Sequence, residues 1–391
     1  MVPTIFKSLT ILILAASTIT AQSPNPSNTS DGSFGPYLQN ATTNSILVCW
    51  RTASSATSVV EYGLTAQLGQ TIQKLSSATY HQVAVTGLTP DTLYHYRARS
   101  LVGTRTVWSE NGTFRTAIDP SQSSTPFTFV HMAETHDHKE VGLFKEEILA
   151  AKPHLIVDAS DHVDYGSKIA EWDEYFTYGA PFYRHIVNFG AVGNHLYLKS
   201  GWFGSGIFGN IDLYKKLAAH PGNEEWYSVR YGNTEFFFIN SNWYYDPWRL
   251  STRQIRWLKK ALAKATDGVN DPVFKVAIHH MPIWSSGPLH REFLDRFWTR
   301  RMLLKHYKRY GLDLALTSHD AHTEHSIDGK FHELQTACGK LRHEWRTKNP
   351  KSVWRHNNGR TIGIIRVQGR QMNVEVVDSD GKRLHTFTVK K

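Results

Sequence analysis

Aspartate, glutamate, asparagine and histidine recur in short groups along the last two thirds of the chain, and these residue types could bind metal ions. Most of the groups follow a short apolar run that is typical of a buried strand. Oxygen and imidazole ligands suit divalent or trivalent ions, and a shared carboxylate can hold two ions about 3.5–4 Å apart. The groups are Glu134-Thr-His136, Asp161-His-Val-Asp164, Gly193-Asn194-His195, His279-His280 and His319-Asp-Ala-His322. The pattern therefore predicts a hydrolytic site with two metal ions.

The segments that must position these groups alternate between apolar runs and longer amphipathic stretches from residue 126 onward. Such alternation predicts an α/β domain whose ligands lie on loops at strand ends. The expected strands are 127–130, 155–157, 186–189, 236–239, 274–278 and 312–316, with three more at 361–368, 372–378 and 384–389. The expected helices are Lys139–Ala151, Ser251–Ala265 and Arg291–Tyr310.

Residues 34–117 follow a different pattern, in which short alternating stretches are separated by turn residues. This pattern is typical of an all-β sandwich. A polar linker, 118–125, separates it from the α/β region, and a flexible Ser/Asn/Pro/Gly-rich lead, 22–33, precedes it.

The two halves together resemble the metallophosphoesterases, and within them the purple-acid-phosphatase-like branch with an N-terminal fibronectin type III-like domain. The N-terminal resemblance rests on Gly35-Pro-Tyr-Leu38, Trp50-Arg-Thr52, Glu61-Tyr-Gly63 and the segment Gly87–Tyr94. The C-terminal resemblance rests on the metal-ligand groups in their order. It implies an α/β fold class: an all-β sandwich followed by a four-layer α/β/β/α calcineurin-like domain over residues 126–391.

The resemblance implies that six residues bind two metal ions, with iron, zinc and manganese as the candidates. Asp161 would bridge both ions, and Asn194 would bind the second. The implied set of metal ligands is Glu134, His136, Asp161, Asn194, His279 and His319.

The implied reaction is hydrolysis of phosphate monoesters by a hydroxide that the two metal ions activate. His195 would hold the phosphate or protonate the leaving group, and His280 would assist it. The expected partner is a phosphorylated small molecule or protein. The formal charge of +10 favours anionic partners in general, and no motif specifically indicates nucleic acid.

Several positions depart from the family pattern. Glu134 stands where aspartate is usual, and Asp164 stands where the purple branch has tyrosine. Ser160 and Ser318 replace glycines, and Ala321 offers no ligand atom. These departures keep a second hypothesis open: a weakened or inactive protein of the same fold that binds an anionic ligand, a glycan or a protein.

The N-terminus is typical of a secretory signal over residues 1–21, since Lys7 precedes the apolar run 9–16 and small residues follow. No apolar run is long enough to cross a bilayer. We therefore expect a secreted protein, with glycosylation sequons at Asn28, Asn40 and Asn111. With only two cysteines, Cys49 and Cys338, two separate buried thiols are expected rather than a disulfide framework.

Overall fold

The computed structural model describes residues 33–136, 138–199, 209–287, 292–339, 341, 345 and 349–391. The predicted export signal, 1–21, and residues 22–32 of the predicted lead lie outside the described residues. Within the described ranges, no helix is both long enough and apolar enough to cross a membrane.

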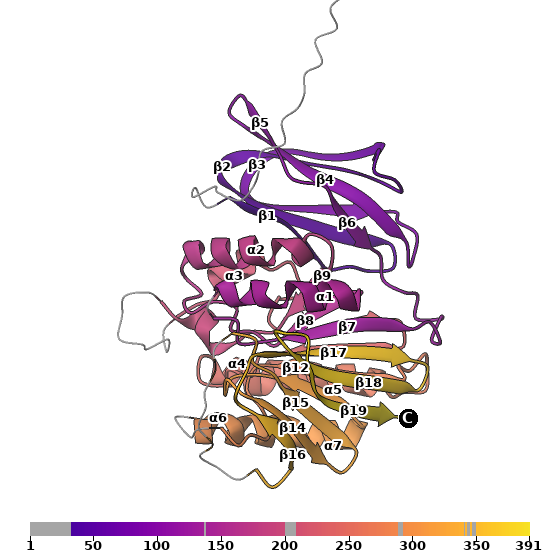
Figure 1. Ribbon diagram of the computed structural model, residues 1–391, viewed down its shortest axis with the longest axis vertical. Helices are drawn as coiled ribbons and strands as arrows, with labels where there is room; N and C mark the ends of the chain where they lie inside the picture. Colours follow the sequence, from indigo (N-terminus) through magenta and orange to yellow (C-terminus); the bar gives the residue numbers. More distant parts are fainter. Residues whose placement is uncertain are drawn as a thin grey trace, which may run out of the picture.

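Two sheets form the centre of the described structure (Figure 1). The first, sheet A, contains β1 (Phe34–Gln39), β2 (Ser45–Gly63), β3 (Gln70–Thr86), β4 (Leu93–Val102), β5 (Arg105–Trp108), β6 (Gly112–Arg115), β7 (Phe127–Met132), β8 (Leu155–Asp158), β9 (Val187–Gly190), β17 (Thr361–Gln368), β18 (Gln371–Asp378) and β19 (Arg383–Lys390). The second, sheet B, contains β10 (Tyr227–Tyr231), β11 (Thr234–Ile239), β12 (Phe274–His279), β13 (Leu314–Thr317), β14 (Thr323–Asp328), β15 (Phe331–Gln335) and β16 (Ser352–His356).

The helical segments are η1 (His138–Phe144), α1 (Lys145–Ala151), α2 (Ile169–Tyr183), η2 (Asn194–Tyr197), α3 (Asp212–Leu217), α4 (Pro247–Arg249), η4 (Leu250–Gln254), α5 (Ile255–Lys264), α6 (Glu292–Thr299), η5 (Arg300–Leu304) and α7 (Lys305–Tyr310). The three helices expected from the sequence are present, and α2 is an additional helix that the sequence analysis did not predict.

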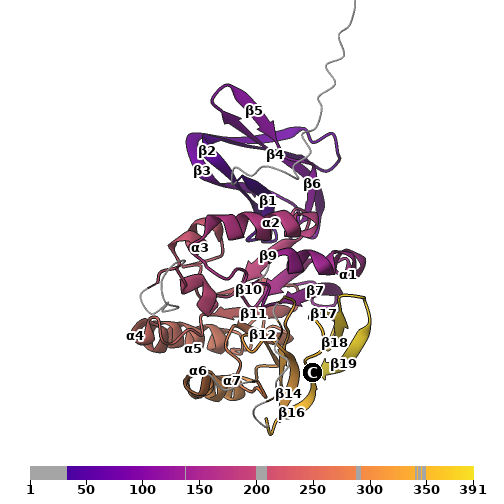
Figure 2. The same ribbon diagram turned by 60° about the vertical axis from the view of Figure 1, so that its left-hand side comes forward.

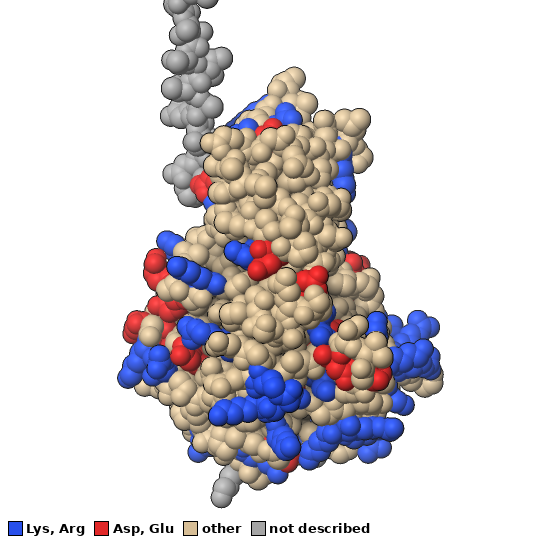
Figure 3. All heavy atoms as spheres, turned by 90° about the vertical axis from the view of Figure 1, so that its right-hand side faces the viewer, with Lys and Arg blue, Asp and Glu red and all other residues tan. Residues whose placement is uncertain are grey.

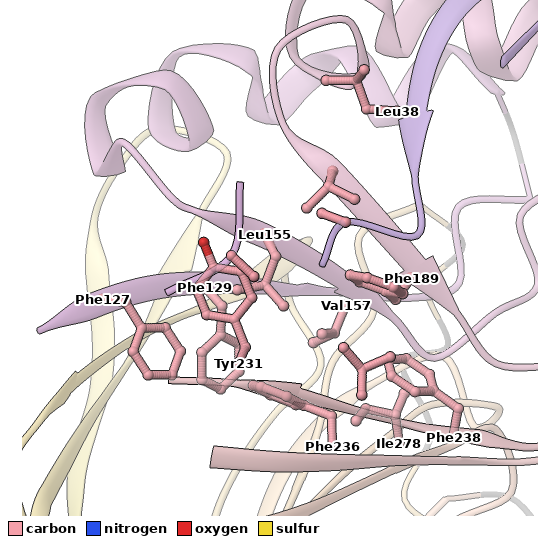
Figure 4. Packing of buried hydrophobic residues seen from close by; sticks show 14 of the residues in the cluster. Leu38, Phe127, Phe129, Leu155, Val157, Phe189, Tyr231, Phe236, Phe238 and Ile278 are labelled. Atoms are coloured by element: carbon pink, nitrogen blue, oxygen red, sulfur yellow. The ribbon is translucent and has the colours of Figure 1, made fainter. Parts of the chain in front are cut away.

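Three hydrophobic clusters define four layers, as predicted. The inner cluster lies between the sheets, where Phe129 and Val157 of sheet A face Phe236 and Ile278 of sheet B (Figure 4). A second cluster packs the outer face of sheet A against α1 and α2, and a third packs the outer face of sheet B against α5 and α7. Successive strand residues point to opposite faces, so each strand serves both an inner and an outer core.

The N-terminal strands continue sheet A and are not separated from it. β1 pairs in parallel with β9, with Gln39 opposite Asn188. The side-chain amide of Gln39 donates to Asn188 Oδ1 at 3.3 Å, and Tyr37 Oη donates to the carbonyl of Leu217 at 2.7 Å. These buried contacts couple the N-terminal strands to the α/β region, which the pattern of a sandwich followed by a linker did not predict.

The helix that leads into α5 begins four residues before the expected start at Ser251. Asp246 caps it, because its carboxylate accepts from the backbone amide of Arg249 at 3.1 Å. Gln254 lies at the end of η4, inside this helical stretch rather than at its start. Its side chain is buried and bonds both backbone groups of Asn240, at 2.9 and 2.8 Å. This contact ties the helix to the loop after β11.

Both cysteines are buried and free, as expected. Cys49 lies in β2 and Cys338 follows β15.

Candidate metal centre

The predicted site residues lie on loops that leave the carboxyl ends of five strands. β7, β8 and β9 run parallel in sheet A, and β12 and β13 run parallel in sheet B. Their carboxyl ends therefore meet at the same edge of the two packed sheets. This edge brings together Glu134, His136, Asp161, Asn194, His195, His280 and His319.

Four of these side chains converge closely enough to hold one metal ion. Asp161 Oδ2 lies 3.0 Å from His280 Nε2, and Asn194 Oδ1 lies 2.8 Å from the same nitrogen. His319 Nδ1 is 3.2 Å from Asn194 Oδ1 and 3.1 Å from His280 Nε2. Two oxygens and two imidazole nitrogens that face one another fit a divalent cation. We call this set the four-ligand cluster.

His280 occupies the position that the sequence analysis gave to His279. The Nδ1–H of His280 donates to the carbonyl of Ala159 at 3.1 Å, which aims Nε2 into the cluster. Such a backbone contact on the remote nitrogen is the usual way a metal-binding histidine is oriented. His280 also stacks edge-on against His319, with ring centroids 4.9 Å apart.

His279 points away from the cluster. It ends β12, and on a strand its side chain shares a face with Ala277, which packs in the outer cluster of sheet B. Its Nδ1–H donates to the carbonyl of Met281 at 2.8 Å, and its ring centroid lies 6.0 Å from that of Tyr307 on α7. The alternation of side chains along a strand is the signal that could have distinguished His279 from His280. His280 is two residues after Ile278, so both side chains belong to the inner face.

The expected first metal position is occupied by protein side chains bonded to one another. Glu134 accepts from Ser318 Oγ at 2.7 Å and from the backbone amide of His319. Its other oxygen bonds His136 Nε2 at 2.8 Å, while His136 Nδ1 bonds Asp164 Oδ1 at 3.0 Å. The longer glutamate thus reaches across to Ser318, and the ring of His136 lies between carboxylates. Protein donors therefore engage Glu134, although His136, Asp161 and His195 still present ligand atoms within 4.8 Å of one another.

The electrostatics of the centre reflect this pairing. Burial alone would lower the pKa of His136, but Glu134, Asp164 and Asp161 raise it to about 10. Burial would raise the pKa of Asp161, but His280, His195 and His136 hold it well below its usual range. The acids Glu134 and Asp161 are therefore compensated by His136 and His280, whose pKa values are raised, whereas burial lowers the pKa values of His195 and His319.

His195 lies at the open side of the centre. Its Nδ1–H donates to the carbonyl of Asp164 at 2.8 Å, and its backbone amide donates to Asp161 Oδ1 at 3.1 Å. Its side chain is 21% exposed and that of Asp164 is 44% exposed, whereas the side chain of Asp161 is 2% exposed. A ligand entering the centre would thus meet His195 and Asp164 first.

The remaining candidates lie apart from the centre. His322 bonds Glu324 at 3.1 Å and contacts Trp345, so it does not replace the ligand missing at Ala321. The ring of Tyr165 lies against the ammonium of Lys168 at 4.5 Å.

The loops of the centre adopt strained backbone conformations. Positive φ angles occur at the non-glycine residues Glu134 (58°), His136 (31°), Ser160 (81°), Asp161 (55°), His319 (81°) and Ala321 (52°). Side chains in this region cost about 1–3 kcal/mol each, and they persist where the surroundings enforce them. Asp158 enforces the turn before Asp161, because its Oδ1 accepts from the amide of Ser160 at 2.7 Å.

We expect Ser160→Gly to raise the melting temperature by about 2–4 °C. Glycine removes the strain at φ 81° and also removes a buried hydroxyl that has no hydrogen-bond partner among the described residues. The matched control is Ser55→Gly in the exposed part of β2, which should lower the melting temperature slightly. A lower melting temperature for Ser160→Gly would show that the strain is smaller than the entropy that glycine adds to the unfolded chain.

Comparisons with known proteins bear on the N-terminal domain and on the fold. Residues 35–116 match the family described as Purple acid Phosphatase, N-terminal domain. A protein of Arabidopsis thaliana named "Probable inactive purple acid phosphatase 24" is 23% identical over 276 residues, which are 61% of this chain and 42% of that relative. The chain therefore spans less than half of that relative's length.

Two solved structures share the fold. The purple acid phosphatase PPD1 from yellow lupin (Lupinus luteus) seeds has a TM-score of 0.75 at 18% identity, over 91% of this chain and 74% of that one. The structure of PhoD has a TM-score of 0.70 at 14% identity, over 93% of this chain and 91% of that one. The chain thus combines a segment that matches the N-terminal domain of purple acid phosphatases with the fold that these two structures share.

Proposed function

We propose that the protein is a phosphoesterase with a one-metal centre, which binds a divalent ion at the four-ligand cluster and acts on phosphate monoesters. The proposal rests on the convergence of Asp161, Asn194, His280 and His319. Their neighbouring oxygen and nitrogen atoms are between 2.8 and 3.2 Å apart. When bound, the ion supplies Lewis-acid polarisation of a phosphoryl oxygen and lowers the pKa of water.

The protein's own groups complete the centre. The imidazole of His195 is fixed by its bond to the carbonyl of Asp164, so its Nε2 can contact a phosphoryl oxygen or the leaving oxygen at the open side. Asp161 orients His195 through the backbone amide and His280 through the side chain. Asp158 holds the turn that carries Asp161.

The first position receives no ion in this proposal. The carboxylate of Glu134 is already engaged by three donors, from Ser318, His319 and His136. We therefore propose a centre with one ion instead of the two-ion mechanism that the family resemblance implies.

A binding role without turnover is the second candidate. Two observations favour this role. Glu134 is already bonded to His136 at the first metal position, and the name of the Arabidopsis relative contains the word "inactive". In this case the ion and His195 would hold a phosphorylated ligand at the open side without cleaving it.

One experiment separates the two functions. Protein loaded with Zn²⁺ or Mn²⁺ is assayed for hydrolysis of p-nitrophenyl phosphate, and its binding of inorganic phosphate is measured by calorimetry. The enzyme reading predicts metal-dependent hydrolysis that a chelator abolishes. Phosphate binding without hydrolysis would support the binding role, and hydrolysis that resists the chelator would contradict the one-metal centre.

We also propose that the protein is exported, because Lys7 and the apolar run 9–16 have the pattern of a signal peptide. N-terminal sequencing of protein collected from the medium of a secreting host should find cleavage near residue 21. Retention of residues 1–21 in a protein that stays inside the cell would contradict this.

A further inference from the structure

The outer helical layer on sheet B carries a dense set of basic side chains. α5 and α7 lie side by side over this sheet (Figure 2). Their exposed basic residues, with those of the adjoining turns η4 and η5, are Arg253, Arg256, Lys259, Lys260, Lys264, Arg300, Arg301, Lys305, Lys308 and Arg309. No aspartate or glutamate occurs in 250–266 or in 296–311. We call this set the basic helical face.

The charges on this face follow the helix axes. Arg256, Lys260 and Lys264 occupy positions i, i+4 and i+8 of α5, and Lys305 and Arg309 occupy i and i+4 of α7. Residues four apart lie on one side of a helix, so each row places a cation about every 6 Å along the axis. The result is two short lines of positive charge on neighbouring helices.

The two lines meet around a buried histidine. His306 of α7 is 8% exposed, and burial lowers its pKa, as do the charges of Lys305, Lys259 and Arg309. Lys259 belongs to α5, so cations of both helices act on this one ring. A neutral histidine between the helices adds no further charge to the face.

Few of these cations have an acidic partner. Lys308 pairs with Asp328 at 2.7 Å, and the guanidinium of Arg300 lies 3.8 Å from the centre of the Trp284 ring. Among the described residues, no carboxylate forms an ion pair with the others. Uncompensated like charges on adjacent helices repel one another, and an external polyanion would remove that repulsion.

The rows of cations themselves contain no exposed large hydrophobic residue. Among the described residues none lies in 250–266 or 299–310, although Trp248, Phe297 and Trp298 are exposed just before η4 and η5. A membrane-binding helix carries such residues along its length for insertion, and a single-stranded nucleic acid stacks on aromatic rings along its binding groove. Both helices also lie flat on sheet B, so neither projects as a groove-reading helix does.

We propose that the basic helical face binds a linear, sulfated or carboxylated polysaccharide that lies along α5 and α7. On the side of the molecule that Figure 3 shows, lysine and arginine gather toward the lower end, and fewer charged residues are visible on the upper end. The ligand is held by charge spacing rather than by pockets, which suits a flexible chain with regularly repeated anionic groups. This surface is separate from the metal centre, so its occupancy does not depend on the proposed phosphoesterase function.

The test uses the full chain and a fluorescent heparin oligosaccharide at about 0.15 M salt. The variant Arg256→Gln/Lys260→Gln/Lys305→Gln should bind heparin about 100-fold more weakly, because it loses three cations of the face. The control Arg105→Gln/Lys152→Gln/Lys382→Gln has the same net charge, and its substitutions lie away from α5 and α7. It should bind as the unmodified chain does.

Equal loss in the two variants would show that only net charge matters and would overturn the proposal. Tighter binding of duplex DNA than of heparin at the same salt would assign the face to nucleic acid instead. All six substituted side chains are exposed, and melting curves that match the unmodified chain establish that both variants are folded.

Discussion

Asp161→Asn is expected to lower the affinity for a divalent metal ion by more than about 100-fold and to abolish metal-dependent hydrolysis. Loss of a residue that only orients a ligand already costs about 10–100-fold in affinity, and Asp161 is the charged ligand itself. The substitution keeps the shape of the side chain and the Oδ1 acceptor for the amide of His195. It removes the negative charge that faces His280 and His136.

Calorimetric titration with Zn²⁺ measures this effect. The control is Asp380→Asn, in the exposed turn between β18 and β19, which should bind as the unmodified chain does. Melting curves in chelator are needed to establish that the Asp161→Asn variant is folded. A folded variant with unchanged affinity would mean that the ion binds elsewhere.

His280→Gln and His279→Gln are expected to differ sharply, although the residues are adjacent. His280→Gln removes the nitrogen at the centre of the four-ligand cluster, so metal affinity should fall by at least about 10–100-fold. His279→Gln should leave the affinity unchanged. It should cost about 1 kcal/mol of stability, because the buried bond to the carbonyl of Met281 is disturbed.

The comparison requires metal titration and a melting curve for each variant. The opposite result, with normal binding in His280→Gln and lost binding in His279→Gln, would restore the ligand assignment made from the sequence. Equal loss in both variants would indicate that the loop after β12, rather than one imidazole, determines the affinity.

The sequence predicts the fold class well because the strands are short apolar runs that end at polar groups. The runs at 127–130, 155–157 and 274–278 became β7, β8 and β12, each extended by one or two residues. The sequence did not predict α2, because Gly179 and Pro181 are unfavourable inside a helix. The helix is also rich in buried aromatic residues, so its sequence lacks a clear polar face.

The site was predictable in outline but not in detail. The order of groups after successive strands placed Asp161, Asn194 and His319 together, since parallel strands end at one edge. The bond between Glu134 and Ser318 joins residues 184 positions apart, and no local pattern reports it. The sequence did not predict that Asp164 pairs with His136. The family resemblance assigned position 164 only as the place where a tyrosine is missing.

Two of the five departures from the family pattern, Glu134 and Ser318, have structural consequences that reinforce one another. The length of Glu134 allows it to reach Ser318, and the hydroxyl of Ser318 is the donor that receives it at 2.7 Å. Ser160 carries the strain expected where glycine is usual, with φ of 81°, whereas Ser318 does not have a positive φ. Glu134 is thus held in a hydrogen-bonded group with Ser318, His319 and His136, and the four-ligand cluster remains beside it.

The number of metal ions that each chain holds is the most direct test of the one-metal centre. The chain is incubated with excess Zn²⁺ or Mn²⁺, separated from free ions by gel filtration, and measured by native mass spectrometry. We expect one ion per chain in the unmodified protein and in the Ala321→His variant. A second ion should appear only when Glu134→Asp is combined with Ala321→His. Two tightly held ions in the unmodified chain would contradict the one-metal centre.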